Sequence, residues 1–262
     1  MPEFVEAEAY RRTAEPLIGH RVERLEIRDE RLLRQGSESR SLIGGILGGA
    51  ELRAVRRIGK AVLLDTDREH TAVLSFGLRG RLVLDGATAR ATGGWRHREP
   101  RPDHVRLAVH AGEHRLELED QLRLATLRID PDESRFGTDV LELDKAGFCE
   151  LCARSSRPIK SLLMDQSRIA GIGNLVADEI LFQGKVDPRR CADELDDEAL
   201  DALWDGLRRT RRRVLERNGS HQGVMIRSGA RERGSDCPRC GVAVRRVDVG
   251  GRTTYFCPQH QR

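Results

Sequence analysis

Four side chains suited to metal binding lie in the last 26 residues of the chain. Cys237 and Cys240 are separated by two residues, and Cys257 and His260 repeat that spacing sixteen residues further on. Such a pair sits on a tight turn that points both side chains at one ion, and tetrahedral Zn²⁺ prefers thiolates and neutral imidazole as ligands. Four protein ligands leave no open position, so the sequence predicts one structural zinc. The alternative is a set of unrelated buried thiols.

The residues between the two pairs have the pattern of a β-hairpin. Residues 244–249 and 252–256 are strand-like, and they flank Gly250-Gly251, which favours a two-residue turn. Arg252 lies near the tip of this hairpin, which suggests a contact with nucleic acid. Zinc ribbons also hold protein partners, so a protein-binding role stays open.

A second candidate site is the segment Gly171-Ile172-Gly173-Asn174, which opens a helical pattern. Glycines let the backbone approach a ligand closely, and Asn174 can cap the helix that follows. Backbone N–H groups at a helix start attract an anion, which in a DNA-binding protein is a backbone phosphate. The alternative is an ordinary joint between two helices.

The chain begins Met1-Pro2-Glu3-Phe4-Val5-Glu6, which places two carboxylates near a proline nitrogen. Proline followed by glutamate in the first turn is also what any helix start favours, so a purely structural role is the alternative. Lysine is rare, since 42 of the 46 basic residues are arginines. In such a chain a retained lysine suggests a need for a compact or deprotonatable amine, which makes Lys60 and Lys160 candidates.

The composition excludes several classes of protein. With 38% hydrophobic and 34% charged residues the chain is globular rather than disordered, and no apolar run approaches the roughly 20 residues of a membrane-spanning helix. Six cysteines, at least three of them potential zinc thiolates, fit the reducing cytoplasm better than a disulfide framework. A net charge of +4 permits nucleic-acid binding without requiring it. The densest basic block is Arg208–Arg213, which suits a nucleic-acid contact. The alternative is that it is the solvated face of a helix.

The order of predicted elements indicates an α+β protein. Residues 3–18 predict a helix that stops at Gly19. From 20 to about 130 the pattern is that of short strands at hairpin spacing, which an antiparallel β-sandwich would close. The glycine-rich stretch 41–50 follows no strand and lacks a P-loop lysine, so we expect a loop there. The predicted strands are 61–65, 71–75, 81–85 and 105–109.

Helices dominate the second half. Three are predicted, at 158–165 with Pro158 at its first position, at 174–182, and at 193–217 with an apolar face. Cys149 and Cys152 lie in helical sequence and are expected to be paired helix positions rather than a redox or second metal site, and Cys191 is expected to be structural. Residues 218–236 are expected to be a linker into the zinc hairpin. The predicted domains are 1–130 (catalytic), 131–232 (DNA-binding) and 233–262 (zinc finger).

Together these motifs resemble the formamidopyrimidine-DNA glycosylase and endonuclease VIII family, DNA repair enzymes that excise damaged bases. The resemblance runs along the whole chain in order, from the Met-Pro-Glu start through Ile58-Gly59-Lys60 to a helix–two-turn–helix and the zinc hairpin. Its most specific piece is DQSRIAGIGNLVADEILFQG at 165–184. It implies an N-terminal helix plus an antiparallel β-sandwich, then a helical helix–two-turn–helix domain with a C-terminal zinc-ribbon β-hairpin.

The resemblance also implies a glycosylase with abasic-site lyase activity. Once Met1 is removed, the secondary amine of Pro2 has a pKa near 8, so part of it is neutral at physiological pH. It attacks the sugar C1′, expels the base and leaves an iminium that eases β-elimination. Glu3 protonates the sugar ring or shuttles its proton, and Glu6, one turn on, faces the same site.

The implied partner is damaged or abasic DNA, and no membrane association is implied. The resemblance also implies a monomer in the cytoplasm, which associates with the nucleoid while it is bound to DNA. The target base must leave the helix stack to be reached. Lys60 assists β-elimination or holds phosphate, and Arg252 holds phosphate and acts in a δ-elimination. The implied DNA-binding residues are Leu78, Arg123, Lys160, Gly171, Gly173, Asn174 and Arg252.

The chain departs from the family where damage is recognised. Leu78 stands where the family has a void-filling methionine, and Leu122 and Leu124 stand where it has an arginine and a phenylalanine. An apolar side chain can still wedge between bases, and Arg123 could replace the missing arginine from a shifted register. The segment 218–236 is shorter than the loop that covers an oxidised purine, which argues against 8-oxoguanine as the preferred substrate.

Three alternatives to the bifunctional enzyme stay open. One is an abasic-site lyase or a specialised adduct glycosylase that lacks ordinary lesion recognition. Another is a non-catalytic binder of damaged DNA, against which the retained Pro2, Glu3, Glu6 and Lys60 argue. The third is a zinc-ribbon protein adaptor, which would show no salt-dependent affinity for DNA.

Overall fold

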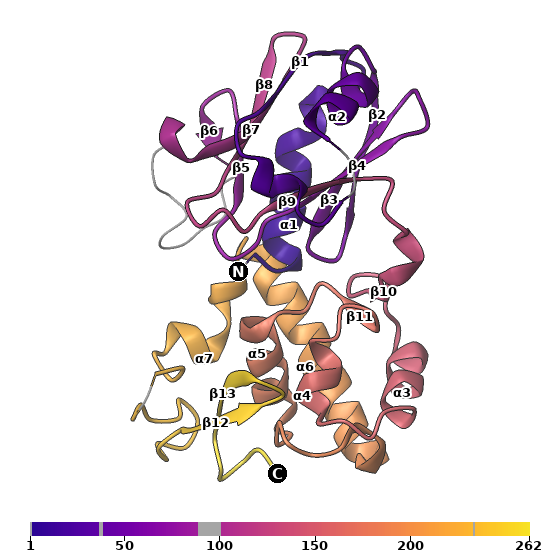
Figure 1. The fold of residues 1–262 in the computed structure, drawn as a ribbon. Helices are drawn as coiled ribbons and strands as arrows, with labels where there is room; N and C mark the ends of the chain where they lie inside the picture. The colour runs from indigo at the N-terminus through magenta and orange to yellow at the C-terminus, as the bar shows by residue number, and fades with distance from the viewer. Residues whose placement is uncertain (1, 37–38, 89–100, 233) are drawn as a thin grey trace. The chain divides into compact units, whose positions relative to one another are not determined.

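The computed structural model describes residues 2–36, 39–88, 101–232 and 234–262. The chain forms two compact units, Met1–Ser134 and Arg135–Arg262 (Figure 1). The zinc hairpin belongs to the second unit, and the division of the chain into three domains stays a prediction.

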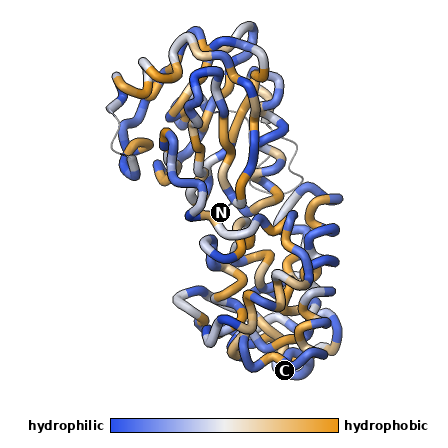
Figure 2. Tube along the Cα trace, turned by 90° about the vertical axis from the view of Figure 1, so that its right-hand side faces the viewer, coloured by the Kyte–Doolittle hydropathy of each residue, from blue (hydrophilic) through white to orange (hydrophobic). Residues whose placement is uncertain are grey.

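Two antiparallel sheets build the first unit, as the sequence predicts. One has the strand order β1-β7-β8-β5-β6 and the other the order β2-β3-β4-β9. The apolar faces of both sheets enclose one core, and hydrophobic residues follow the strands while the turns between them are hydrophilic (Figure 2). The strands are β1 Val22–Ile27, β2 Leu52–Ile58, β3 Ala61–Thr66, β4 Thr71–Ser75, β5 Arg81–Leu84, β6 Ala87–Thr88, β7 Val105–Ala111, β8 His114–Glu119 and β9 Thr126–Ile129.

The N-terminal helix α1 (Phe4–Ala14) packs against β2 and β3 of one sheet and β5 of the other. It ends in the short 3₁₀ turn η1 (Glu15–Leu17), and Gly19 follows with a φ of +85° that only glycine adopts without strain. The α-helix thus ends at Ala14, earlier than the predicted stop at Gly19, and only the 3₁₀ turn continues to Leu17. The described part of this unit also contains the 3₁₀ turns η2 (Glu30–Leu33) and η4 (Pro102–His104).

The glycine-rich stretch 41–50 is not the expected loop, because most of it forms helix α2 (Arg40–Leu47). The Ser39 side chain caps this helix by accepting the N–H of Leu42 at 3.2 Å. Ile43 and Leu47, one turn apart, are buried in the core. Burial of this pair and the cap outweigh the low helix propensity of the two glycines between them.

The second unit is mostly helical. The 3₁₀ turn η5 (Glu133–Arg135) straddles the boundary between the units, and one small parallel bridge joins β10 to β11. Cys149 and Cys152 are confirmed as positions of one helix, α3. The elements are β10 Thr138–Asp139, α3 Lys145–Ala153, α4 Ile159–Leu163, β11 Ile169–Ala170, α5 Asn174–Gly184, η6 Ala192–Glu194, α6 Asp197–Glu216, η7 Ser220–Gln222, α7 Val224–Arg227, β12 Arg245–Val249 and β13 Arg252–Phe256.

Three details of the second unit differ from expectation. Pro158 is the residue before α4 rather than its first helical position, in an extended conformation. The long helix α6 begins at Asp197, because the Asp196 side chain caps it by accepting the N–H of Ala199 at 2.8 Å. The expected linker contains η7 and α7, and its Met225 is fully buried beside Phe182.

Candidate functional site

The N-terminal segment holds two buried carboxylates next to Pro2. Glu3 and Glu6 are 1% and 0% exposed. The backbone N–H of Glu3 donates to Glu6 Oε2 at 2.8 Å, and the two residues form a capping box at the start of α1. This fixes the backbone that follows Pro2, and it keeps both carboxyl groups within one helical turn of the proline nitrogen. Met1 lies outside the described residues.

Lys60 is half-buried in the two-residue turn between β2 and β3, in which Gly59 has a φ of +58°. Arg57 ties this turn to α1, since its Nη1 donates to the Gly59 carbonyl at 2.9 Å and its Nε lies 3.4 Å from Glu8 Oε2. Burial raises the pKa of Glu8, but hydrogen bonds from Arg11 and other arginines outweigh it and hold the pKa below its usual range. The ionised Glu8 therefore anchors the lysine-bearing turn to the helix that begins beside Pro2.

Three exposed leucines lie on two neighbouring loops of the first unit. Leu78, between β4 and β5, is 48% exposed, and Leu122 and Leu124, between β8 and β9, are 42% and 40% exposed. The loops touch, because a Cβ on Gly77 would lie 2.6 Å from the Cβ of Leu124. Three exposed apolar side chains on adjoining loops offer an uncharged wedge to a ligand.

Buried polar contacts hold these loops in place. The Asp120 carboxylate accepts the N–H groups of Leu122, Leu124 and Ala125 at 3.0, 2.6 and 2.7 Å. Arg123, between those leucines, has a φ of +56°, and its Nε lies 3.5 Å from Asp29 Oδ2.

The loop that carries Leu78 is held in place at its C-terminal end, where it leads into β5. Arg81, the first residue of β5, pairs with the buried Glu119 with a nitrogen–oxygen distance of 2.6 Å. The Tyr10 hydroxyl donates to the carbonyl of Gly80 at 3.3 Å. These contacts connect the leucine loops to α1 and β8.

Lys160 does not have the exposed position that a phosphate contact requires. Its side chain is 0% exposed, and Nζ lies 2.6 Å from Asp178 Oδ1 and donates to Thr254 Oγ1 at 2.7 Å. Arg231 also pairs with Asp178, at 2.8 Å. We therefore correct the expected DNA contact, since Lys160 joins α4 and α5 to strand β13. Sequence reasoning does not find Asp178, Arg231 and Thr254, because no motif or spacing connects these distant residues.

Asn174 also contacts β13 rather than capping its own helix. The N-cap of α5 is Gly173, and Asn174 Nδ2 donates to the carbonyl of Thr253 at 3.1 Å. The turn before it is held by Gln166, whose Oε1 accepts the N–H of Gly171 at 3.0 Å. The expected cap at Asn174 is wrong, but the side chain lies next to the hairpin residue that follows Arg252.

Arg252 is exposed at the start of β13, directly after the turn Gly250-Gly251. Both glycines have positive φ, +59° and +73°, as a type I′ turn requires. A Cβ on Gly250 would lie 2.5 Å from the hydroxyl of Ser161, so the hairpin tip passes closely over α4. The structure brings Asn174 and Arg252 to one region of the second unit.

Cys237, Cys240, Cys257 and His260 form the predicted zinc site. Their ligand atoms all lie within 4.8 Å of one another. Cys240 Sγ is 3.4 Å from Cys257 Sγ and 3.7 Å from His260 Nδ1. A tetrahedral Zn²⁺ with bonds of about 2.0–2.3 Å places its ligand atoms about 3.5–3.8 Å apart, so the residues fit the ion. Burial and the charges of Arg239 and Lys185 lower the pKa of His260, which keeps the imidazole in the neutral form that zinc binds.

Sequence models of one family match nearly the entire chain. The formamidopyrimidine-DNA glycosylase N-terminal domain matches residues 1–127, the formamidopyrimidine-DNA glycosylase H2TH domain matches 130–225, and a zinc finger found in FPG and IleRS matches 234–259. The last match includes three of the four zinc ligands directly and ends one residue before His260.

Full-length relatives and solved structures agree with these matches. The chain is 27% identical to a formamidopyrimidine-DNA glycosylase of Solibacter usitatus and 29% identical to one of Streptococcus mutans, each covering 100% of both chains. Structures of Lactococcus lactis Fpg with N7-benzyl-Fapy-dG DNA and with abasic DNA share the fold, each with a TM-score of 0.81, at 23% and 22% identity. These cover 100% and 99% of both chains. Within the described ranges, no helix has the length and apolar content to cross a membrane.

Proposed function

Because this chain belongs to the formamidopyrimidine-DNA glycosylase family, we propose that it is a base-excision-repair DNA glycosylase that also cleaves abasic sites. The observation that carries the proposal is the capping box at the start of α1. It holds two buried carboxyl groups, those of Glu3 and Glu6, within one turn of Pro2.

Once Met1 is removed, the amine of Pro2 is the nucleophile. Its nitrogen forms a bond to the sugar C1′, the bond from C1′ to the base breaks, and the base leaves with the electron pair. The remaining N–H proton is lost to solvent, the bond from C1′ to the ring oxygen breaks, and the nitrogen lone pair forms an iminium ion whose nitrogen carries no hydrogen. Glu3 supplies the proton that opens the ring, and Glu6 fixes the Glu3 backbone. Loss of a C2′ proton then expels the 3′ phosphate, and Lys60 assists this elimination.

DNA is held by parts of both units in this proposal. In the second unit Asn174 and Arg252 bind backbone phosphate, with Gly171 and Gly173 shaping the turn before α5. In the first unit Leu78 fills the space left by the extruded base, and Arg123 contacts DNA only if it leaves Asp29. Zinc, when bound by its four ligands, fixes the hairpin that carries Arg252 and takes no part in the chemistry.

The lesion is a damaged base other than typical 8-oxoguanine. The segment after α6 is short, and it is folded onto the helices: the N–H of Met225 donates to Glu179 Oε2 at 2.9 Å. That segment therefore offers little chain to cover an oxidised purine. A lyase or adduct glycosylase without ordinary lesion recognition is the second candidate, and the three exposed leucines favour it.

Borohydride trapping on a duplex with one abasic site tests the proposal. We expect a covalent adduct that maps to Pro2 in protein whose intact mass lacks Met1. Glu3→Gln keeps an acceptor for the capping box but cannot protonate the sugar, so it should slow base excision by about 10²–10⁴-fold. Glu15→Gln, an exposed substitution beyond the end of α1, is the matched control and should leave the rate unchanged. A protein that starts at Pro2 and binds DNA without forming an adduct would be a non-catalytic binder.

A further inference from the structure

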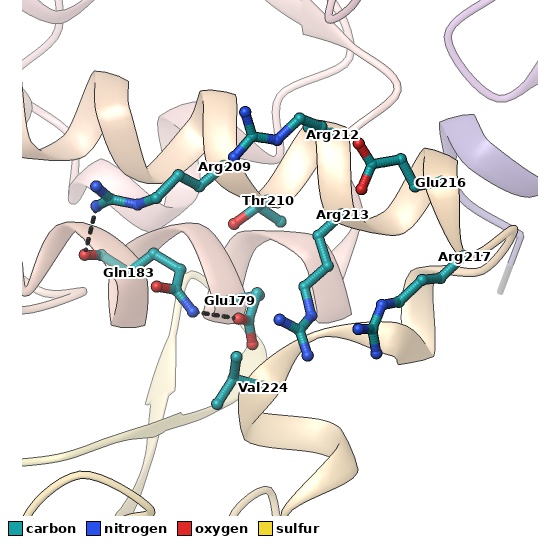
Figure 3. A pocket seen from close by; sticks show the side chains of 9 residues that line it. All are labelled: Glu179, Gln183, Arg209, Thr210, Arg212, Arg213, Glu216, Arg217 and Val224. Atoms are coloured by element: carbon teal, nitrogen blue, oxygen red, sulfur yellow. Dashed lines mark hydrogen bonds between the residues drawn. The ribbon is translucent and has the colours of Figure 1, made fainter.

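A cavity of about 250 Å³ lies in the second unit between α5, α6 and α7, and its lining includes none of the zinc ligands. Figure 3 shows arginines of α6 and its C-terminal end along one wall, with Glu179 of α5 and Val224 of α7 opposite. Arg209, Arg213 and Arg217 follow each other at steps of four residues, so they share one helix face with a rise of about 6 Å per step. The charged residues that line it are Glu179, Arg209, Arg212, Arg213, Glu216 and Arg217.

The cavity contains part of the basic block that neither the chemistry nor the zinc site uses. That block is not one solvated face, because its members have different contacts. Arg211 Nη1 donates to the carbonyl of Val140 at 2.8 Å, which is a structural contact. Arg208 lies 4.0 Å from Asp205 and does not line the cavity. Arg209 and Arg213 do line it.

Two of the four arginines that line the cavity, Arg209 and Arg213, use only part of their hydrogen-bonding capacity in their contacts with backbone carbonyls. Arg209 donates through Nη2 to the carbonyl of Gln183 at 3.2 Å, and Arg213 donates through Nε to the carbonyl of Gln222 at 2.9 Å. Each guanidinium has five N–H donors in a fixed fork, so each has capacity for further acceptors. These carbonyl contacts orient the groups beside the cavity (Figure 3).

The carboxylate on the opposite wall is already engaged. Glu179 is 1% exposed, its Oε1 accepts from Gln183 Nε2 at 2.7 Å, and its Oε2 accepts the N–H of Met225 at 2.9 Å. With four arginines against Glu179 and Glu216, the charge of the lining is +2 (4 − 2 = 2). An anion would compensate this excess of positive charge.

We propose that this cavity binds phosphate groups, as a second anion site in addition to the DNA-binding residues of the proposed function. Guanidinium groups are always charged, and their planar fork matches the oxygens of phosphate in pairs. The row of arginines along α6 suits a ligand with two or more linked phosphates. Such a ligand is either a nucleic-acid backbone or a free polyphosphate, and both present the same chemistry to the arginines.

The test compares two double variants that each remove two positive charges. Arg209→Gln/Arg217→Gln changes both ends of the cavity, where both side chains are exposed. Arg154→Gln/Arg208→Gln is the control, because its arginines are exposed, belong to the same unit and lie outside the cavity lining. We expect both double variants to have the melting temperature of the unmodified protein. If Arg209→Gln/Arg217→Gln melts at a lower temperature, Arg212→Gln/Arg217→Gln is used in its place.

Two binding measurements distinguish the sources of phosphate. In calorimetric titration with inorganic pyrophosphate, the cavity variant should bind at least tenfold more weakly than the control. In a salt series with undamaged duplex DNA, the slope of log affinity against log salt should become shallower by about 0.9 per lost phosphate contact. Loss of pyrophosphate binding alone assigns the cavity to a free polyphosphate, and a shallower DNA slope, with or without that loss, assigns it to the DNA backbone. Equal behaviour of the cavity variant and the control in both measurements overturns the proposal, whether or not the protein excises bases.

Discussion

Lys160 shows how one residue can have a role that its sequence position does not indicate. It lies in the segment that resembles a DNA-binding joint, yet it is fully buried and pairs with Asp178, which also pairs with Arg231. One buried carboxylate therefore compensates two cations. The cluster joins α4 and α5 to Thr254 in β13, so it positions the hairpin that carries Arg252.

The charge balance of this cluster predicts which of two substitutions destabilises the protein more. Asp178→Asn leaves two cations without a counter-charge and should lower the free energy of unfolding by about 3–5 kcal/mol. Lys160→Met leaves the neutral Asp178–Arg231 pair and removes the hydrogen bond to Thr254, so it should cost about 1–3 kcal/mol. Urea unfolding measures both values.

Lys145→Met is the control for these two variants. Lys145 also pairs with an aspartate, Asp201, at 2.7 Å, but both side chains are largely exposed. Its loss should leave the unfolding midpoint unchanged, because exposed ion pairs contribute little. If Lys160→Met proved more destabilising than Asp178→Asn, the assignment of Asp178 as the central charge would be wrong.

At the scale of elements, the zinc hairpin is where sequence and structure agree best. The spacing of Cys237, Cys240, Cys257 and His260 predicts both the ligand set and the hairpin between the pairs, and the structure has both. Local spacing suffices there because a metal site and a two-residue turn are set by residues close together in sequence. The same holds for the predicted strands.

Elements that depend on distant contacts were predicted less well. Helix α2 was missed because its two glycines favour a loop, and only the burial of Ile43 and Leu47 in the core reveals the helix. The cap expected from Asn174 failed because its side chain bonds to Thr253, 79 residues away. The same distinction applies to the candidate site. Its residues can be named from the resemblance, whereas contacts such as that of Arg57 with Glu8 are seen only in the structure.

Removal of zinc should loosen the second unit selectively. Cys237 and Cys257 are buried in one cluster with Phe182, Met225 and Ala230, so loss of the ion exposes part of that core. Cys257→Ser should lose the metal, and hydrogen exchange should rise across β12, β13 and α7 while strands β7 and β8 keep their protection. Mass spectrometry of exchanged peptides and elemental analysis measure the two effects.

Two variants delimit this prediction. His260→Cys replaces one ligand by another and keeps a closed set of four, so this variant should retain one zinc per chain. Cys191→Ser changes a thiol outside the site and should behave as the unmodified protein does. Loss of zinc from the Cys191 variant, or full retention in Cys257→Ser, would contradict the ligand set.

At the scale of the whole molecule, the proposed function assigns the choice of substrate and the chemistry to different groups. The start of α1, the Lys60 turn and the zinc hairpin retain the motifs of the family. The departures are in the leucine loops of the first unit and in the short segment after α6 of the second. Under the proposed function, such a molecule keeps the reaction of the family and acts on a different lesion.

The leucine loops make a prediction about the base opposite the lesion. A side chain that reads a base through two hydrogen bonds discriminates by about 1–3 kcal/mol, which is about 5-fold to 150-fold in rate or affinity. Leu78, Leu122 and Leu124 cannot form such bonds, and Arg123 is held beside Asp29. Single-turnover cleavage of an abasic site should therefore vary less than about threefold when A, C, G or T stands opposite.

A substitution that adds a base-reading side chain to the leucine loops tests this prediction further. Leu122→Arg introduces a donor at the exposed loop and should make the rate depend on the opposite base, most strongly in favour of guanine, whose O6 and N7 can both accept from one guanidinium. Leu42→Arg places the same side chain at another exposed leucine, 52% accessible on α2, and should leave the rates uniform. A tenfold preference already present in the unmodified protein would mean that Arg123 leaves Asp29 on binding and reads the opposite strand, and Arg123→Gln should then abolish that preference.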